Sequence, residues 1–257
     1  MNFPPINLQG FEAREDRLKA IKRYDDPYFG QMFYRTSDWE HSWRVLWIFE
    51  SIAEQTLAVY RDFDVHFART LALVHDDAEM ITGDVQLFRK EQMTLAEKAE
   101  LARQEVLAME TLAAEFPQYC NGYNYAELLH AAQGKERLEA QVVSYCDKFD
   151  GFGEALHEVW AGNHSFLRPV QGRNKDGGYI SRLAEFSGKY HSLRDLLNME
   201  HPIFRVTRIN FDLIAERGEP HTPESAVRDS SYAPYEYWKK TVVEHLGLAS
   251  LIEQKEV

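Results

Sequence analysis

The sequence predicts an all-α fold. No segment alternates apolar and polar residues with the period of two that is typical of a half-buried strand. Apolar residues recur instead three and four positions apart, which places them on one face of a helix. Capping residues begin many of these segments, and glycine or proline ends them, so the chain divides into separate helices.

Local signals mark the ends of the helices. Ser37 or Asp38 can cap the second helix, and Gly83 can end the third. A capping box, Thr94 to Glu97, begins the fourth. We expect that helix to bury an apolar face made by Leu95, Ala102, Val106, Met109, Ala113 and Phe116. The expected helices cover residues 11–23, 39–60, 64–83, 94–116, 124–134, 136–161, 179–198, 203–217, 223–230 and 234–254.

The length of 257 residues suits one large domain or one domain with an appendage. Hydrophobic residues make up 44% of the chain, so we expect a sizeable core. We expect a core domain over residues 1–161 and a C-terminal helical extension over residues 162–257 that packs on it. Residues 162–178 are rich in glycine, asparagine and other polar residues, and they predict a long surface loop.

The composition excludes several classes of partner. The net charge of −12 argues against a nucleic-acid polymer, because phosphate backbones need a basic face, but it leaves room for a local pocket that binds one small phosphate. No apolar run approaches the roughly 20 residues that span a bilayer, so we expect no membrane partner. The two cysteines fit a reducing compartment, and the N-terminal residues lack the pattern of a secretory signal, so we expect a cytoplasmic protein.

An apolar run that begins at Leu71 leads directly into a group of ionisable residues. His75 and Asp76 are adjacent, Glu79 follows three residues later, and Asp84 lies beyond it. Burying an unpaired ionisable group costs on the order of several kcal/mol. A metal ion is the simplest group that could compensate so many of them.

Two other predicted helices each direct one ionisable group inward. His41 begins the apolar face of helix 39–60, and Asp147 lies between aromatic positions in helix 136–161. Taken singly, such residues are more often hydrogen-bonded or paired than metal ligands. Together with His75 and Asp76 they supply two imidazoles and two carboxylates, a set that suits one divalent transition metal (Mn, Co, Fe, Ni or Zn). Water acidified by that metal is the expected nucleophile.

At these positions the chain resembles the HD-domain metal-dependent phosphohydrolases, and among them the YfbR-like 5′-deoxynucleotidases most closely. The resemblance covers roughly residues 15–160 and implies an HD-domain helical bundle with additional C-terminal helices. The matching motifs are Arg23-Tyr24, Arg35-Thr36, Glu40-His41-Ser42, His75-Asp76 with Glu79 and Thr82-Gly83-Asp84, and Asp147-Lys148.

The resemblance implies a role for each matching residue. The implied ligands of one divalent metal are His41, His75, Asp76 and Asp147. Glu79 would act as a general acid or base and orient the attacking water, and Asp84 would hold the sugar hydroxyl or assist the metal ligands. Arg23 would grip the phosphate, and Lys148 could reach the substrate. Tyr24 stands where the family places a tryptophan that selects deoxyribose, so the choice between ribose and deoxyribose stays open.

The implied activity is the release of phosphate from (deoxy)nucleoside 5′-monophosphates, with a small nucleotide as partner, in a homo-oligomer that we expect to be a dimer. An alternative keeps the same mononuclear site but hydrolyses a nucleoside triphosphate or another phosphoanhydride, with phosphate contacts from the C-terminal helices. A third interpretation is a non-enzymatic nucleotide-binding or structural domain with a vestigial site. The intact set of ligands, together with Glu79, argues against this third interpretation.

Overall fold

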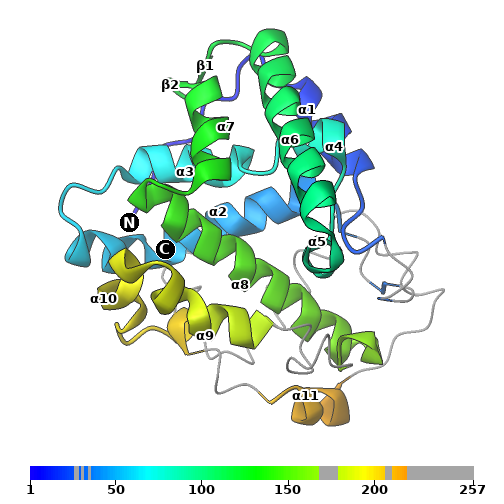
Figure 1. Ribbon diagram of the computed structural model, residues 1–257. Helices are drawn as coiled ribbons and strands as arrows, with labels where there is room; N and C mark the ends of the chain where they lie inside the picture. Colours follow the sequence, from blue (N-terminus) through cyan, green and yellow to red (C-terminus); the bar gives the residue numbers. More distant parts are fainter. Residues whose placement is uncertain (26–28, 30–31, 34–35, 168–178, 206–209, 219–257) are drawn as a thin grey trace.

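The computed structural model confirms the all-α fold (Figure 1). It describes every residue except 26–28, 30–31, 34–35, 168–178, 206–209 and 219–257. Arg35 and the helices expected over residues 223–230 and 234–254 therefore lie outside the described residues. No helix in the described ranges combines the length and the apolar character needed to cross a bilayer.

The described helices are α1 (Ala13–Ala20), α2 (Asp38–Val59), α3 (Val65–Val74), α4 (Glu79–Thr82), α5 (Leu87–Gln92), α6 (Leu95–Glu115), α7 (Tyr125–Gly134), α8 (Leu138–Trp160), α9 (Tyr179–Lys189), α10 (Arg194–Leu197) and α11 (Phe211–Arg217). Three short 3₁₀ turns join them, namely η2 (His164–Leu167), η3 (His191–Leu193) and η4 (Pro202–Phe204). Two-residue strands, β1 (Tyr119–Cys120) and β2 (Tyr123–Asn124), form an antiparallel hairpin between α6 and α7, with Tyr119 opposite Asn124.

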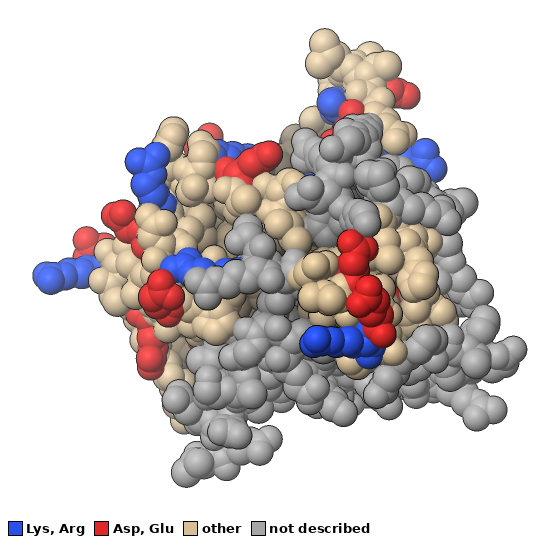
Figure 2. Space-filling model, turned by 90° about the horizontal axis from the view of Figure 1, so that it is seen from below, with Lys and Arg blue, Asp and Glu red and all other residues tan. Residues whose placement is uncertain are grey.

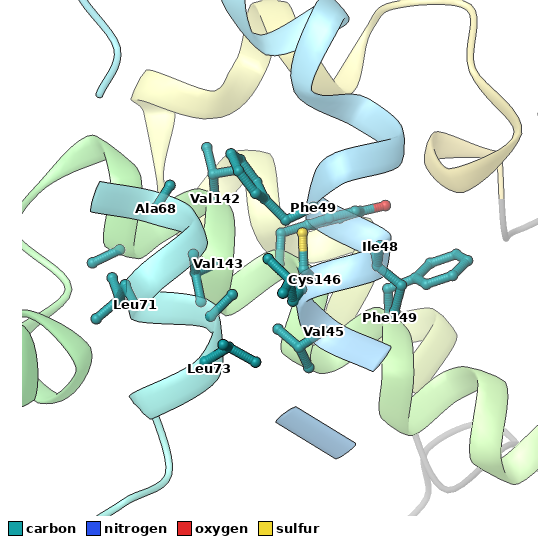
Figure 3. Close-up of a cluster of buried hydrophobic side chains, with 14 of the residues drawn as sticks. Val45, Ile48, Phe49, Ala68, Leu71, Leu73, Val142, Val143, Cys146 and Phe149 are labelled. Carbon is teal, nitrogen blue, oxygen red and sulfur yellow. The ribbon is translucent and has the colours of Figure 1, made fainter. Parts of the chain in front are cut away.

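Helices α2, α3 and α8 form the centre of the core (Figure 3). Their facing side chains are almost fully buried: Val45, Ile48 and Phe49 from α2, Ala68, Leu71 and Leu73 from α3, and Val142, Val143, Cys146 and Phe149 from α8. Each large side chain among them contributes about 1.5–3 kcal/mol by leaving water. This packing fixes the relative positions of the three helices from which we expected metal ligands.

The helix expected over residues 64–83 is in fact two helices. Asp64 caps α3 as predicted, since its carboxylate accepts a hydrogen bond from the backbone N–H of Phe67 at 2.9 Å. Helix α3 then ends at Val74, and a turn separates it from α4. Gly83, with a φ of 72°, ends α4 in a conformation that glycine adopts at little cost. The break turns the ionisable residues away from the axis of α3.

The apolar face that we expected along α6 is only partly buried. Leu95 is 88% exposed, Val106 is 38% exposed and Ala102 is exposed, so the prediction was wrong for the first half of the helix. Met109 and Phe116 are buried as expected. The cause is the position of α6 at the edge of the molecule, where it packs against α4 and α7 through the residues of its C-terminal half (Figure 1).

The segments after residue 161 lie against the same core. Helices α9 and α11 contact α8, and α10 contacts α2. Their buried side chains, which include Tyr179, Phe186 and Phe211, belong to the hydrophobic cluster that contains the central helices. The helix expected over 179–198 is divided into α9, η3 and α10. The described residues of the helix expected over 203–217 form part of η4 and all of α11. The domain boundary at residue 161 stays a prediction.

The surface of the described residues mixes both signs of charge. On the face shown in Figure 2, acidic and basic side chains are interspersed. The net charge of −12 is therefore not gathered into one patch on that face.

Candidate active site

The structure brings the four expected metal ligands together. Helix α2 supplies His41, the turn after α3 supplies His75 and Asp76, and α8 supplies Asp147. His41 Nε2 lies 3.2 Å from His75 Nε2, 3.2 Å from Asp76 Oδ2 and 3.5 Å from Asp147 Oδ1. His75 Nε2 lies 3.3 Å from Asp76 Oδ2. A ring nitrogen of each histidine and an oxygen of Asp147 lie within 4.8 Å of one another, and Asp76 Oδ2 lies beside both imidazoles.

The hydrogen bonds behind the two imidazoles fix where their protons lie. His41 Nδ1 is 2.6 Å from a carboxylate oxygen of Asp150, and His75 Nδ1 is 2.9 Å from the carbonyl oxygen of Ala72. Because these oxygens only accept, each Nδ1 must carry the hydrogen. The two Nε2 atoms then face each other beside two carboxylates. A positive charge is needed among these atoms to offset their repulsion, and when a divalent metal supplies it in place of a proton, both Nε2 lone pairs can bind the metal.

The pKa shifts show that the site favours positive charge. Burial and the nearby Arg23 lower the pKa of His41. Hydrogen bonds to Asp147, Asp150 and Asp76 outweigh both effects and hold that pKa well above its usual value. Burial alone would raise the pKa values of Asp76 and Asp147, but neighbouring positive groups lower both well below the usual carboxyl value. The two carboxylates are therefore ionised and the centre of the site is negative.

A second acidic group lies next to this centre and consists of Asp38, Glu79 and Asp84, which offer oxygens within 4.8 Å of one another. Burial raises the pKa of Asp38 to about 7. Burial also raises the pKa of Glu79, which lies well above its usual value because Asp76 and the other acids add to the effect. Both shifts favour the protonated forms of these acids.

Asp38 was considered in the sequence only as a helix cap, and Ser37 takes that position instead. The Asp38 side chain is fully buried, and neither carboxylate oxygen has a hydrogen-bond partner among the described residues. Its nearest cation is Arg23, whose Nη1 lies 3.6 Å away. The position three residues before His41, on the same face of the helix, is the sequence signal that could have identified it.

Arg23 and Tyr24, which follow α1, occupy different environments. Arg23 donates from Nε to Glu154 at 2.8 Å and lines the cavity beside Glu79 and Asp84. Tyr24 is 1% exposed, and its hydroxyl lies 2.5 Å from the hydroxyl of Tyr179, which does line the cavity. The expected contact between Tyr24 and substrate therefore stays a prediction, and the aromatic wall of the cavity is formed by Tyr179.

The cavity in front of these residues has a volume of about 440 Å³, which lies within the range of small-ligand sites. The expected site residues that line it are Arg23, Asp76, Glu79, Asp84, Asp147 and Lys148. Lys148 also forms an ion pair with Asp147. The remaining wall includes Lys90, a basic residue near these motifs in the sequence. It also includes side chains that sequence reasoning did not single out, namely Lys135, Tyr179, Arg182, Phe186 and Lys189. Those from α9 could not be assigned from local patterns, because only the tertiary packing of α9 on α8 places them there.

Comparisons with known proteins agree with this geometry. The model of the family described as 5′-deoxynucleotidase YfbR-like matches residues 11–176. No curated protein sequence matches the chain.

Two solved structures share the fold. A protein from Pyrococcus horikoshii OT3 is 21% identical, with a TM-score of 0.53, and the match covers 82% of this chain and 99% of that one. A predicted metal-dependent phosphohydrolase from Magnetospirillum magnetotacticum MS-1 is 18% identical, with a TM-score of 0.53 and coverage of 83% and 94%.

The family match extends from α1 past the end of α8 and so includes all four expected ligands. The chain therefore belongs to the YfbR-like 5′-deoxynucleotidase family and is a phosphohydrolase.

Proposed function

We propose that the protein hydrolyses (deoxy)nucleoside 5′-monophosphates to the nucleoside and phosphate, with one divalent transition metal bound by His41, His75, Asp76 and Asp147. The observation that supports this proposal most directly is that the Nε2 atoms of two histidines lie together beside two ionised carboxylates. When bound there, the metal would acidify water and draw charge from the phosphoryl oxygens.

The side chains around the cavity supply the remaining chemistry. Glu79, whose pKa is raised, can hold a proton and pass it to the leaving 5′-oxygen. Arg23 is anchored through Nε to Glu154, and its Nη groups, of which Nη1 also lies 3.6 Å from Asp38, can hold the phosphate. Asp84 lies on the cavity wall where it can accept a hydrogen bond from a sugar hydroxyl. Lys148 adds a positive charge next to Asp147.

We propose that Tyr179 forms the wall against the sugar and that Tyr24 acts through it. The ring of Tyr179 lies directly on the backbone of α8, since a Cβ atom on Gly151 would be 2.5 Å from Tyr179 Cε1. The hydroxyl of Tyr179 is held by Tyr24. Tyr179 is therefore the side chain whose shape would discriminate between ribose and deoxyribose.

The alternative substrate, a nucleoside triphosphate, is favoured by one observation. Beyond Arg23, the cavity is lined by further cationic side chains, namely Lys90, Lys135, Lys148, Arg182 and Lys189. A longer phosphate chain could use these charges. Substrate and product together separate the two reactions, because inorganic phosphate released from a nucleoside monophosphate supports the first and tripolyphosphate or pyrophosphate released from a triphosphate supports the second.

Elemental analysis of the purified protein, followed by a phosphate-release screen, tests the proposal. We expect about one equivalent of a divalent transition metal per chain, and phosphate release from one or more ribo- or deoxynucleoside 5′-monophosphates. Metal-loaded protein that releases phosphate from none of them would refute the proposed substrate class. Sedimentation equilibrium tests the homodimer that we also propose.

A further inference from the structure

A buried chain of ions connects the metal-ligand side of the site to the arginine that faces the phosphate. Asp150 accepts from His41 Nδ1 at 2.6 Å and from Arg44 Nε and Nη2 at 2.7 and 2.9 Å. Arg44 Nη2 also contacts Glu154 at 2.6 Å, and Glu154 accepts from Arg23 Nε at 2.8 Å. The side chains of His41, Arg44 and Asp150 are 0% exposed, and that of Glu154 is 4% exposed.

The helices place these groups in register. On α8, Asp147, Asp150 and Glu154 are spaced by three and four residues, so all three lie on one face. On α2, His41 and Arg44 are likewise three residues apart. One face of α8 therefore carries three linked groups: Asp147, a proposed metal ligand; Asp150, the partner of the proposed ligand His41; and Glu154, the partner of Arg23.

We infer that Asp150 and Glu154 are positioning residues, with Arg44 as the cation that joins them. Asp150 holds the proton of His41 on Nδ1 and so directs Nε2 toward the metal, and Glu154 fixes the guanidinium of Arg23 toward the phosphate. This inference rests on the proposed function, in which His41 binds the metal and Arg23 binds the phosphate.

Stability alone does not account for this arrangement. A buried ion pair usually contributes little net stability, because removing the charges from water costs about as much as their attraction returns. Here two cations, Arg23 and Arg44, contact the two carboxylates, and Asp150 remains in place to accept the Nδ1 hydrogen of His41. Burial raises the pKa of Glu154, but Arg23 and Arg44 outweigh it and lower that pKa to about 2, so the carboxylate stays charged.

The same contacts argue against a cation among His41, Asp150 and Glu154, although their ligand atoms lie close enough together to hold one. Both oxygens of Asp150 and one oxygen of Glu154 already contact the guanidinium of Arg44. The second oxygen of Glu154 accepts from Arg23. The positive charge in this part of the core is therefore supplied by arginine.

Two substitutions test the two ends of this chain of ions separately. Asp150→Asn removes the charge behind His41, and we expect the affinity of the metal-free protein for Co²⁺, measured by calorimetry without nucleotide, to fall about tenfold or more. Glu154→Gln loosens Arg23, and we expect the affinity of the Co²⁺-loaded protein for inorganic phosphate to fall about tenfold, while the affinity for Co²⁺ changes less than about threefold. Glu139→Gln, at a buried carboxylate near the other end of α8, is the matched control and should change neither affinity.

The pattern of effects decides the inference. Equal losses of both affinities in Asp150→Asn and Glu154→Gln would indicate a merely structural role and overturn it. If either variant fails to fold, ¹⁵N NMR of histidine in the Zn²⁺-loaded wild-type protein tests the role of Asp150. A proton on Nδ1 of His41 would support that role, and a proton on Nε2 would contradict it. Thr36→Val tests the role of Glu154 in positioning Arg23, because it removes the hydroxyl that donates to Glu154. Unchanged phosphate affinity in that variant would count against this role. These measurements need no nucleotide, so a failure of the proposed substrate would be seen separately in the phosphate-release screen.

Discussion

Replacing Arg14 by methionine should destabilise the fold strongly, because it leaves a buried aspartate without its counter-ion. Arg14 lies on α1 and forms two parallel hydrogen bonds with Asp77, from Nε at 2.7 Å and from Nη2 at 2.5 Å. The same Nη2 donates to the carbonyl oxygen of Leu73 at 2.6 Å. The two side chains are 1% and 0% exposed. The pair thus ties α1 to the turn that presents His75 and Asp76.

The size of the effect follows from burial. Removing one member of a fully buried ion pair costs roughly 3–5 kcal/mol, because the other charge remains in a poorly solvated site. After the substitution, Asp77 would keep the hydrogen bond that Tyr125 donates at 2.7 Å, which satisfies one oxygen but does not balance the charge. For a chain of this size each kcal/mol lowers the melting temperature by about 2–4 °C, so we expect a fall of roughly 6–20 °C.

Thermal and urea unfolding, followed by circular dichroism at neutral pH, measure this change. Arg103→Met is the matched control, because Arg103 also forms a two-point pair with a carboxylate, Glu100, but both side chains are exposed. We expect no resolvable shift for the control. If the cost arises from the stranded charge, adding Asp77→Asn to Arg14→Met should recover part of the stability. A loss below about 1 kcal/mol in Arg14→Met would refute the reasoning.

Four further predictions concern the site and the pH dependence of folding. Asp76→Ala should lose bound metal and phosphate release together, as measured by elemental analysis and a phosphate assay, and full metal retention would contradict its role as a ligand. Glu79→Gln should keep the metal but lower kcat by about 10²-fold, so near-normal turnover would exclude Glu79 as the acid or base. Burial lowers the pKa of His201 to about 4, below the 6.5 of an exposed histidine, so the unfolded chain binds this proton more tightly and stability should fall as the pH drops through that interval. His201→Asn, which keeps an acceptor for the N–H of Ile203, should flatten this part of the stability profile in urea titrations, and an unchanged profile would contradict the assignment. Gly151→Ala should displace the ring of Tyr179 and raise KM for a nucleotide without changing metal content, and an unchanged KM would remove Tyr179 from the substrate wall.

Helical periodicity in the sequence was sufficient to orient the ligands on α2 and α8. The spacing of His41 from the apolar residues of its helix predicts that it points inward, and it is fully buried. Local capping signals were equally informative, since Thr94 caps α6 as expected and Asn124, the first residue of the range expected for the next helix, caps α7. These features depend on residues within one or two turns of each other, which is why the sequence alone contains them.

The parts that the sequence did not predict depend on contacts between distant segments. The break after Val74 coincides with the pair between Arg14 and Asp77, residues that are 63 positions apart. The apolar face of α6 is visible in the sequence, but whether another element covers Leu95 depends on the packing of the whole bundle. Tyr179 likewise reaches the cavity only because α9 packs on α8.

The acidic character of the chain is compatible with an anionic substrate, because the net charge of the protein and the positive charges that line the cavity act over different distances. At physiological ionic strength, charges separated by more than about 8 Å are largely screened, so the net charge of −12 acts weakly on a phosphate that has entered the cavity. Within the cavity, Arg23, Lys135 and Lys148 are among the lining residues. Burial, followed by repulsion from Lys148, lowers the pKa of Lys135 to about 8, and an entering phosphate relieves that repulsion. Under the proposed function, capture of the substrate therefore depends on these few side chains and on the proposed metal, and not on the charge of the whole surface.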